Sequence, residues 1–273
     1  MHPLTYSEFY SAAGMSKEQA FTAYALYGGM PLILSRTSDA AKMQYLESLF
    51  SEVYLKDIIE RKKIKRADVL SHIVDLLCSS VGSLTNPTKI ASALNSTQKR
   101  SGVAAVSANT VRSYIDYLAD AFLFTELKRY DVKGKHYFDY TIKTYCEDVG
   151  LRNARLGFRQ EITHTMENII CNELIARGYS VDVGVIRAGK QGSDAQNCEI
   201  DFIATSGDKK YYIQSAYAMP DDEKIAQENR PLTLTGDSFP KLIVRRDIHR
   251  RWYNDQGILN IGVIDFLLDD RAM

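Results

Sequence analysis

Two acidic side chains with strand spacing stand out between residues 197 and 217, which read "NCEIDFIATSGDKKYYIQSAY". Glu199 and Asp201 lie one residue apart in an apolar run, and a second apolar run carries Gln214. Alternate residues of a β-strand face the same way, so both carboxylates are expected on one face. Paired carboxylates can hold a divalent metal ion, although a plain surface hairpin shows the same pattern.

The same alternation predicts which apolar neighbours share a face. Ile203 falls in step with the two acids, whereas Ile200 and Phe202 fall out of step. We therefore expect Ile203 beside the carboxylates, and Ile200 with Phe202 on the buried face of the strand.

These residues resemble a degraded nuclease site. Nucleases of the PD-(D/E)XK type combine a helix carboxylate, an acid on one strand and a D/E-x-K triplet on the next. Here Glu167 and Asp201 fit the first two positions, but the triplet begins at Tyr212 and ends at Gln214. A hard cation prefers several anionic oxygens, and glutamine cannot act as a base. We expect a shallow pocket where the catalytic remnant Glu167, Asp201 and Gln214 meets Glu199, with metal held weakly or not at all by Glu199 and Asp201.

A second candidate site lies between residues 85 and 145. A helix, a linker, a second helix and a strand pair around the turn "VKGK" follow one another, which is the pattern of a winged helix. Residues 85–143 carry nine basic and five acidic side chains, an excess of four positive charges. The candidate nucleic-acid contacts are Asn109, Thr110, Arg112, Lys133 and Lys135. The competing interpretation is a module that only packs domains together.

Two further motifs favour less specific interpretations. "GVIRAGKQ" at 184–191 matches GxxxxGK, but Gln191 replaces the Ser or Thr and no helix is predicted to follow. We expect a coincidental loop there, no Walker A motif in this chain and no ATP hydrolysis by it. "KLIVRRDIHRRW" at 241–252 is a basic cluster that fits either phosphate binding or a solvated strand end.

Composition indicates a soluble protein. The 273 residues include 34 basic and 34 acidic side chains, so the formal net charge of zero gives no overall attraction to nucleic acid or membrane. The four cysteines are scattered without zinc-ligand spacing and fit free thiols in a reducing compartment. With no signal peptide and no apolar stretch long enough to span a membrane, the sequence predicts a cytoplasmic location.

Hydrophobic periodicity predicts an α+β protein. Apolar residues recur at helical spacing before residue 125 and alternate in strands after it. We expect an N-terminal helical region at 1–82, a winged-helix domain at 83–148 and a C-terminal restriction-endonuclease-like α/β domain at 149–273.

The chain also resembles a known family along nearly its whole length. The matching stretches include "PLTYSEFY", "YALYGGMPLIL", "TVRSYIDYLADAFLF", "MENIICNELIARGY", "EIDFIA" and "YYIQSAY". They are similar to the C-terminal part of bacterial and archaeal AAA-type ATPases. In that family a P-loop module precedes a helical segment, a winged helix and a PD-(D/E)XK nuclease-like domain of unknown function. The resemblance implies that this chain begins just after the ATPase module, as a truncated gene product, an excised fragment or a stand-alone derivative.

The sequence therefore predicts a non-catalytic regulatory module that binds nucleic acid or protein and carries a degenerate nuclease-like domain. The alternatives are a divalent-metal-dependent DNA nuclease and a purely structural interaction protein. No cofactor is expected, and Mg²⁺ would bind only if the nuclease site is active. DNA or a protein is the expected partner and a membrane is not; the oligomeric state does not follow from the sequence.

Overall fold

The computed structural model describes residues 2–98, 105–159, 162–188 and 196–269. Residue contacts group the chain into two compact units. Unit 1 comprises Met1–Leu4, Ala23–Glu126 and Tyr140–Gln160, and unit 2 comprises Thr5–Thr22, Leu127–Asp139 and Glu161–Met273. The described residues combine helices with a mixed sheet, which confirms the predicted α+β class. The predicted division into three domains stays a prediction, and each unit is described below by itself.

Unit 1 is largely helical. Its elements are η1 (Pro31–Ile33), α3 (Asp39–Ser48), η2 (Leu49–Leu55), α4 (Lys56–Arg61), α5 (Ala67–Ser79), β1 (Leu84–Thr85), α6 (Pro87–Gln98), α7 (Ala108–Asp120) and α8 (Val149–Arg155). α3, η2 and α4 follow one another without a break, and η2 between the two α-helices is π-helical. In α5, apolar side chains at three- and four-residue spacing are buried, and each contributes about 1.5–3 kcal/mol.

Two helices and a strand pair make up residues 83–148, the segment predicted as a winged helix. α6 and α7 contact each other and α5, which ends before this segment, and the strands β2 (Phe124–Asp131) and β3 (His136–Cys146) follow. Leu84 and Thr85 of β1 pair antiparallel with Lys143 and Ile142 of β3. Local caps explain where the helices begin. The Asn86 carboxamide oxygen accepts hydrogen bonds from two N–H groups of the first turn of α6, and Ser107 caps α7.

A buried carboxylate ties distant parts of unit 1 together. Asp148 caps α8, where its Oδ1 accepts from the N–H of Leu151 at 2.8 Å, and its Oδ2 accepts from the N–H of Gly29 at 2.7 Å. Burial raises the pKa of Asp148 to about 6, although the N–H groups that donate to it pull the pKa down. Gly150 allows the approach, because a Cβ there would lie 2.0 Å from the carbonyl oxygen of Tyr27.

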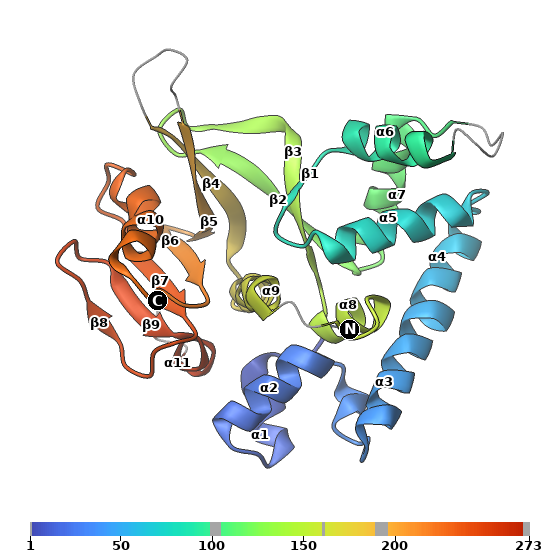
Figure 1. Ribbon diagram of the computed structural model, residues 1–273, viewed down its shortest axis with the longest axis horizontal. Coiled ribbons are helices and arrows are strands. Elements are labelled where there is room, and N and C mark those ends of the chain that lie inside the picture. The colour runs from blue at the N-terminus through green and yellow to red at the C-terminus, as the bar shows by residue number, and fades with distance from the viewer. Residues whose placement is uncertain (1, 99–104, 160–161, 189–195, 270–273) are drawn as a thin grey trace. The chain divides into compact units, whose positions relative to one another are not determined.

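Unit 2 is built on a mixed sheet. Besides residues of β2 and β3, it contains β4 (Ser180–Ala188), β5 (Gln196–Ser206), β6 (Lys209–Ala216), β7 (Lys241–Arg245), β8 (Trp252–Tyr253) and β9 (Leu259–Gly262). From β2 the hydrogen-bonded order is β2-β4-β5-β6-β7-β9-β8 (Figure 1). β2–β4, β6–β7 and β7–β9 are parallel pairs, and β4–β5, β5–β6 and β8–β9 are antiparallel.

Helices cover the unit 2 sheet. α9 (Ile162–Ala176) contacts β4 and β6, and α10 (Asp222–Thr233) contacts β5 and β6. The segment "GVIDFLL" ends β9 and then forms α11 (Val263–Leu268). α11 packs on α1 (Tyr6–Ala13), which comes from the N-terminal end of the chain. The boundary between the units falls inside α2 (Lys17–Tyr27), whose N-cap is Ser16.

A β-bulge changes which side chains share a face of β5. Opposite β4, Gly184 pairs with Ile200 and Asp182 pairs with Ile203, so β5 carries one extra residue between them. Ile200 and Ile203 consequently lie in one core cluster with Leu232 of α10. The prediction that Ile203 faces away from Ile200 is therefore wrong, since strict alternation does not survive a bulge.

Candidate functional site

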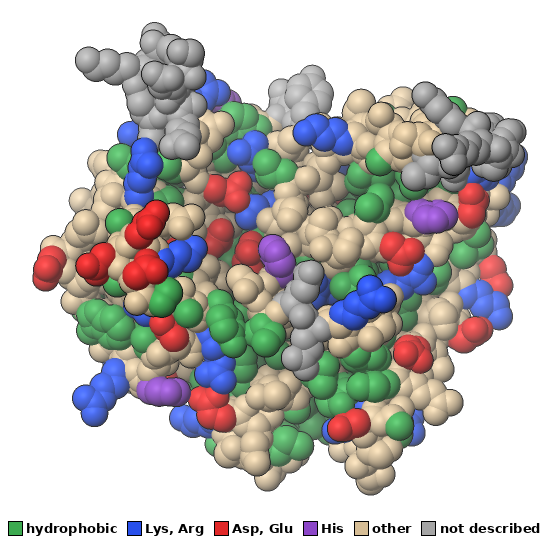
Figure 2. All heavy atoms as spheres, viewed as in Figure 1, with side chains coloured by type: hydrophobic (Ala, Val, Ile, Leu, Met, Phe, Trp, Pro, Cys, Tyr) green, Lys and Arg blue, Asp and Glu red, His purple; other side chains and the backbone are tan. Residues whose placement is uncertain are grey.

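The acidic residues of β5 line an open pocket under α10. The pocket has a volume of about 570 Å³ and receives Asn197, Cys198, Glu199, Asp201 and Gln214 from the sheet and Glu223, Ala226, Gln227, Glu228, Arg230 and Pro231 from α10. Acidic side chains also gather over α10 on the face shown in Figure 2. The sequence-predicted residues Glu199, Asp201 and Gln214 thus do lie together, beside further acids that sequence spacing gave no reason to include.

The side chains of Asp201 and Gln214 each accept a hydrogen bond from the backbone of the opposite strand. The Asp201 N–H donates to Oε1 of Gln214 at 3.4 Å, and the N–H of Ser215 donates to Oδ2 of Asp201 at 2.8 Å. The paired residues of β5 and β6 run from Phe202 opposite Ile213 to the turn that joins the two strands. Asp201 and Gln214 come directly after this paired region, at its end away from the turn. One carboxylate oxygen of Asp201 therefore satisfies a backbone donor.

Tyr212 belongs to the core and not to the pocket. Its side chain is fully buried among the apolar residues that α10 covers. Its hydroxyl donates to Oδ2 of Asp237 at 2.6 Å, and burial together with that carboxylate raises the pKa of the phenol far above its ordinary value. At the position where the nuclease triplet would carry an acid, the chain thus has a structural side chain.

Glu167 is placed by α9, and the residues that line the pocket do not include it. Convergence of Glu167 with Asp201 and Gln214 therefore stays a prediction. Within the described ranges, no three His, Cys, Asp or Glu side chains come together as a group that could hold a metal ion. Glu199 and Asp201 supply two acids, and Gln214 supplies no charge, so these residues do not fit a catalytic Mg²⁺ site.

The predicted nucleic-acid contacts lie in both units. In unit 1, Asn109 is exposed at the start of α7 and Thr110 is half-buried beside its N-cap. Arg112, also on α7, donates to Asp116 and to both oxygens of Glu126. Its charge is already matched by two carboxylates, a tertiary contact that the spacing of the helix alone did not predict.

Lys133 and Lys135 of unit 2 are exposed in the turn between β2 and β3. The buried Asp131 shapes this turn, because its Oδ1 accepts from the N–H groups of Lys133 and Gly134 and its carbonyl accepts from Lys135. Lys135 adopts a left-handed backbone with φ of 55°. The turn holds both lysines outward, and within the described residues neither makes an ion pair.

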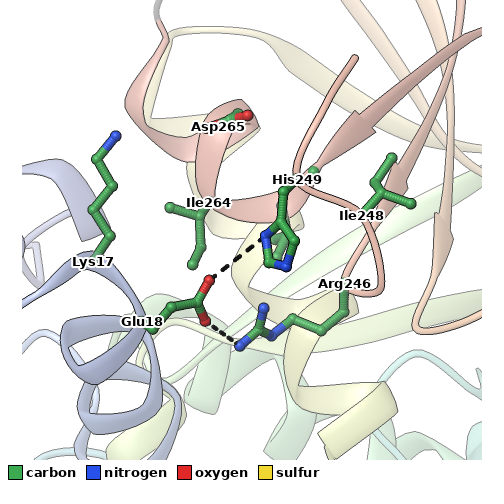
Figure 3. Close-up of a pocket in the computed structure, with 9 residues that line it drawn as sticks. Lys17, Glu18, Arg246, Ile248, His249, Ile264 and Asp265 are labelled. Carbon is green, nitrogen blue, oxygen red and sulfur yellow. Dashed lines mark hydrogen bonds and ion pairs between the residues drawn. The ribbon is translucent and has the colours of Figure 1, made fainter. Parts of the chain in front are cut away.

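The basic cluster at 241–252 is largely neutralised. Arg245 pairs with Asp247, and Arg251 pairs with Asp269. Figure 3 shows the third pair, in which Glu18 reaches Arg246 and lies 4.0 Å from Nδ1 of His249 in a pocket of about 120 Å³. These pairs favour the interpretation of a solvated strand end over a free phosphate site.

The stretch resembling a phosphate-binding loop is only partly described. Gly184 lies inside β4, where a Cβ would come within 2.9 Å of the Cβ of Ile200. This glycine is thus explained by close packing of two strands. Lys190 and Gln191 lie outside the described residues.

Comparison with known proteins places the chain in a family. A family model described as "Domain of unknown function (DUF8612)" matches residues 18–162, just over half of the chain. The chain belongs to this family. An uncharacterized protein of Haemophilus influenzae is 31% identical over 274 residues, which cover 98% of this chain and 64% of that protein. Uncharacterized protein MJ1544 of Methanocaldococcus jannaschii is 25% identical over 243 residues, which cover 88% of this chain and 50% of that protein.

The chain therefore spans between half and two-thirds of the length of these two relatives. Among solved structures, protein VC1899 from Vibrio cholerae matches 85% of this chain and 55% of its own, with 13% identity and a TM-score of 0.27. Within the described residues, no helix is both long enough and apolar enough to cross a membrane.

Proposed function

We propose that the chain is a non-catalytic nucleic-acid-binding module of regulatory function, with a winged-helix segment and a degenerate nuclease-like domain. The single observation that carries the non-catalytic part is the state of Tyr212 and Gln214. Tyr212 is fully buried and bonded to Asp237, and Gln214 offers an uncharged carboxamide beside Asp201. Neither side chain can supply the extra anionic ligand or the base that hydrolysis of a phosphodiester requires.

Two surfaces support nucleic-acid binding, one in each unit. In unit 1, the helices α6 and α7 belong to the segment that we interpret as a winged helix, and Asn109 is exposed on α7. In unit 2, Lys133 and Lys135 project from the hairpin turn without carboxylate partners in the described chain. We assign phosphate contacts to these lysines in preference to Arg112, since Asp116 and Glu126 already engage that guanidinium.

The resemblance to the C-terminal part of AAA-type ATPases implies a helical region, a winged helix and a nuclease-like domain in this order. A regulatory role beside such an ATPase follows from that resemblance and forms part of the proposal.

Binding is tested with a labelled DNA duplex at two salt concentrations. Phosphate contacts release counterions, so Lys133→Ala with Lys135→Ala should weaken binding and reduce the log–log salt slope by about 2. Lys63→Ala with Lys65→Ala is the matched control: these lysines are exposed at the same spacing, and Lys63 shares the left-handed backbone, with φ of 51°. The proposal is contradicted if the affinity for the duplex changes neither with salt nor in the Lys133→Ala with Lys135→Ala variant.

The absence of catalysis is tested separately. Plasmid and linear DNA are incubated with the full chain over a titration of Mg²⁺ or Mn²⁺, and no cleavage is expected. Cleavage that disappears in Asp201→Ala would establish the nuclease alternative. If neither binding nor cleavage occurs, the purely structural alternative is correct.

A further inference from the structure

Aromatic rings and lysines lie next to one another along one row of unit 2, here named the cation–aromatic row. Its members are Lys128, Tyr137, Tyr130, Lys210 and Phe239. The row runs from β2 and β3 to β6 and the segment before β7; in the order of the sheet, β4 and β5 lie between β2 and β6 (Figure 1). None of these residues entered the predicted site, because they meet only when the sheet forms.

Distances show that the row is continuous. The ring centroids of Tyr130 and Tyr137 are 5.1 Å apart at 61°, and Lys128 Nζ is 6.0 Å from the Tyr137 centroid. Lys210 Nζ lies 5.8 Å from the Tyr130 centroid and 5.2 Å from that of Phe239. Each lysine is therefore within cation–π range of a ring.

The carboxylates near the row accept hydrogen bonds from tyrosine hydroxyls, and they also attract the ammonium groups from beyond ion-pair distance: Asp182 attracts Lys128, and Asp237 attracts Lys210. Asp182 accepts a hydrogen bond from the hydroxyl of Tyr137 at 3.0 Å, and Asp237 accepts from the buried Tyr212, whose ring lies 4.7 Å from Lys210 Nζ. Within the described residues, neither Lys128 nor Lys210 makes an ion pair. Both keep a net charge that an external anion can match.

Two aromatic rings of the cation–aromatic row are exposed to solvent. Tyr137 is 50% exposed and Phe239 is 40% exposed, which is high for rings set in a sheet and its adjoining loop. Exposed rings next to unpaired cations are what a single strand needs, because bases stack on rings while phosphates meet lysines. A duplex hides the faces of its bases, so it can use the charges but not the rings.

We propose that the cation–aromatic row binds single-stranded nucleic acid, with bases stacked on Tyr137 and Phe239 and phosphates near Lys128 and Lys210. The proposal rests on the nucleic-acid-binding function and names its substrate class. Burial is the main cause that lowers the pKa of Lys210; the nearby Asp237 raises this pKa, and Lys135 lowers it further. A phosphate that contacts Lys210 and Lys135 together would favour the charged form of both lysines.

The test is fluorescence anisotropy of the full chain with labelled oligothymidylate, oligouridylate and a duplex of equal length. Tyr137→Ala with Phe239→Ala should weaken single-strand binding about tenfold or more and leave duplex binding within twofold. Tyr137→Phe keeps the ring and loses only the hydroxyl, so it should bind like the wild type. The matched control is Tyr253→Ala, because Tyr253 on β8 is 71% exposed and lies outside the row.

The salt dependence of the affinity is a second readout, and unfolding of a variant would not produce the same change in it. With three lysines contacting phosphate, the log–log salt slope for a single strand should be about −2, and Lys210→Gln should make it shallower by about 0.7. Unchanged single-strand binding in the double alanine variant overturns the proposal. If only the duplex binds, and Lys133→Ala weakens duplex binding, the single-strand proposal is wrong and the nucleic-acid-binding function stands. If neither the single strands nor the duplex bind, both proposals are wrong.

Discussion

Asp148 makes the stability of unit 1 depend on pH in a direction opposite to that of most carboxylates. Its pKa is raised from the ordinary 3.8 to about 6, chiefly because burial disfavours the charged form. Between these values the folded chain keeps a proton that the unfolded chain releases. The contribution to stability is therefore fully present below about pH 4 and is lost as the pH rises through about 6.

The magnitude follows from the size of the shift. Two pKa units correspond to about 3 kcal/mol, of which about 2 kcal/mol is lost between pH 4.5 and 7.5. Asp148→Asn removes the titration while keeping the size of the side chain. Its amide faces backbone N–H groups, which costs about 1–3 kcal/mol, but that cost does not change with pH.

The assay is urea unfolding of wild type and Asp148→Asn at several pH values, followed by far-UV circular dichroism. The wild-type unfolding free energy minus that of the variant should fall by about 2 kcal/mol from pH 4.5 to 7.5. Asp68→Asn is the control, since a hydrogen bond from Arg66 lowers the pKa of Asp68. The wild-type unfolding free energy minus that of Asp68→Asn should stay constant from pH 4.5 to 7.5 and decrease only below about pH 4. An Asp148 difference that does not vary with pH would refute the reasoning.

Two further substitutions test packing through thermal and urea unfolding. Gly150→Ala should destabilise by about 3 kcal/mol or more, because its Cβ would meet the carbonyl oxygen of Tyr27. Gly157→Ala, where a Cβ meets open space and φ is 64°, should cost only about 1–2 kcal/mol, and equal costs would contradict the clash. Tyr212→Phe should cost about 1–3 kcal/mol by removing the donor to Asp237, and an unchanged urea midpoint would show that this bond contributes nothing.

Local features of the chain were predictable because their causes lie within a few residues. The apolar spacing of α5, the Ser16 and Asn86 caps and the turn after Asp131 each depend on neighbours in sequence. The change from helical to strand periodicity likewise gave the α+β class. The proximity of Asp201 to Gln214 followed from a hairpin whose two strands are joined by a short polar turn.

Other features depend on contacts that no local pattern encodes. The extra residue of β5 is defined only against β4, so strand alternation misplaced Ile203. Arg112 looked free to meet DNA until the fold brought Glu126 to it.

The sequence by itself thus determined the change from helices to strands and the residues that cap the helices. It also determined that position 214 carries an uncharged glutamine where the nuclease triplet has a lysine. Only tertiary structure decided that Asp148 is buried against Gly29, 119 residues away, and that Lys210 lies among rings from β2 and the segment before β7. The physical reason is that burial and charge pairing depend on which distant segments meet, whereas periodicity and capping act through nearest neighbours along the chain.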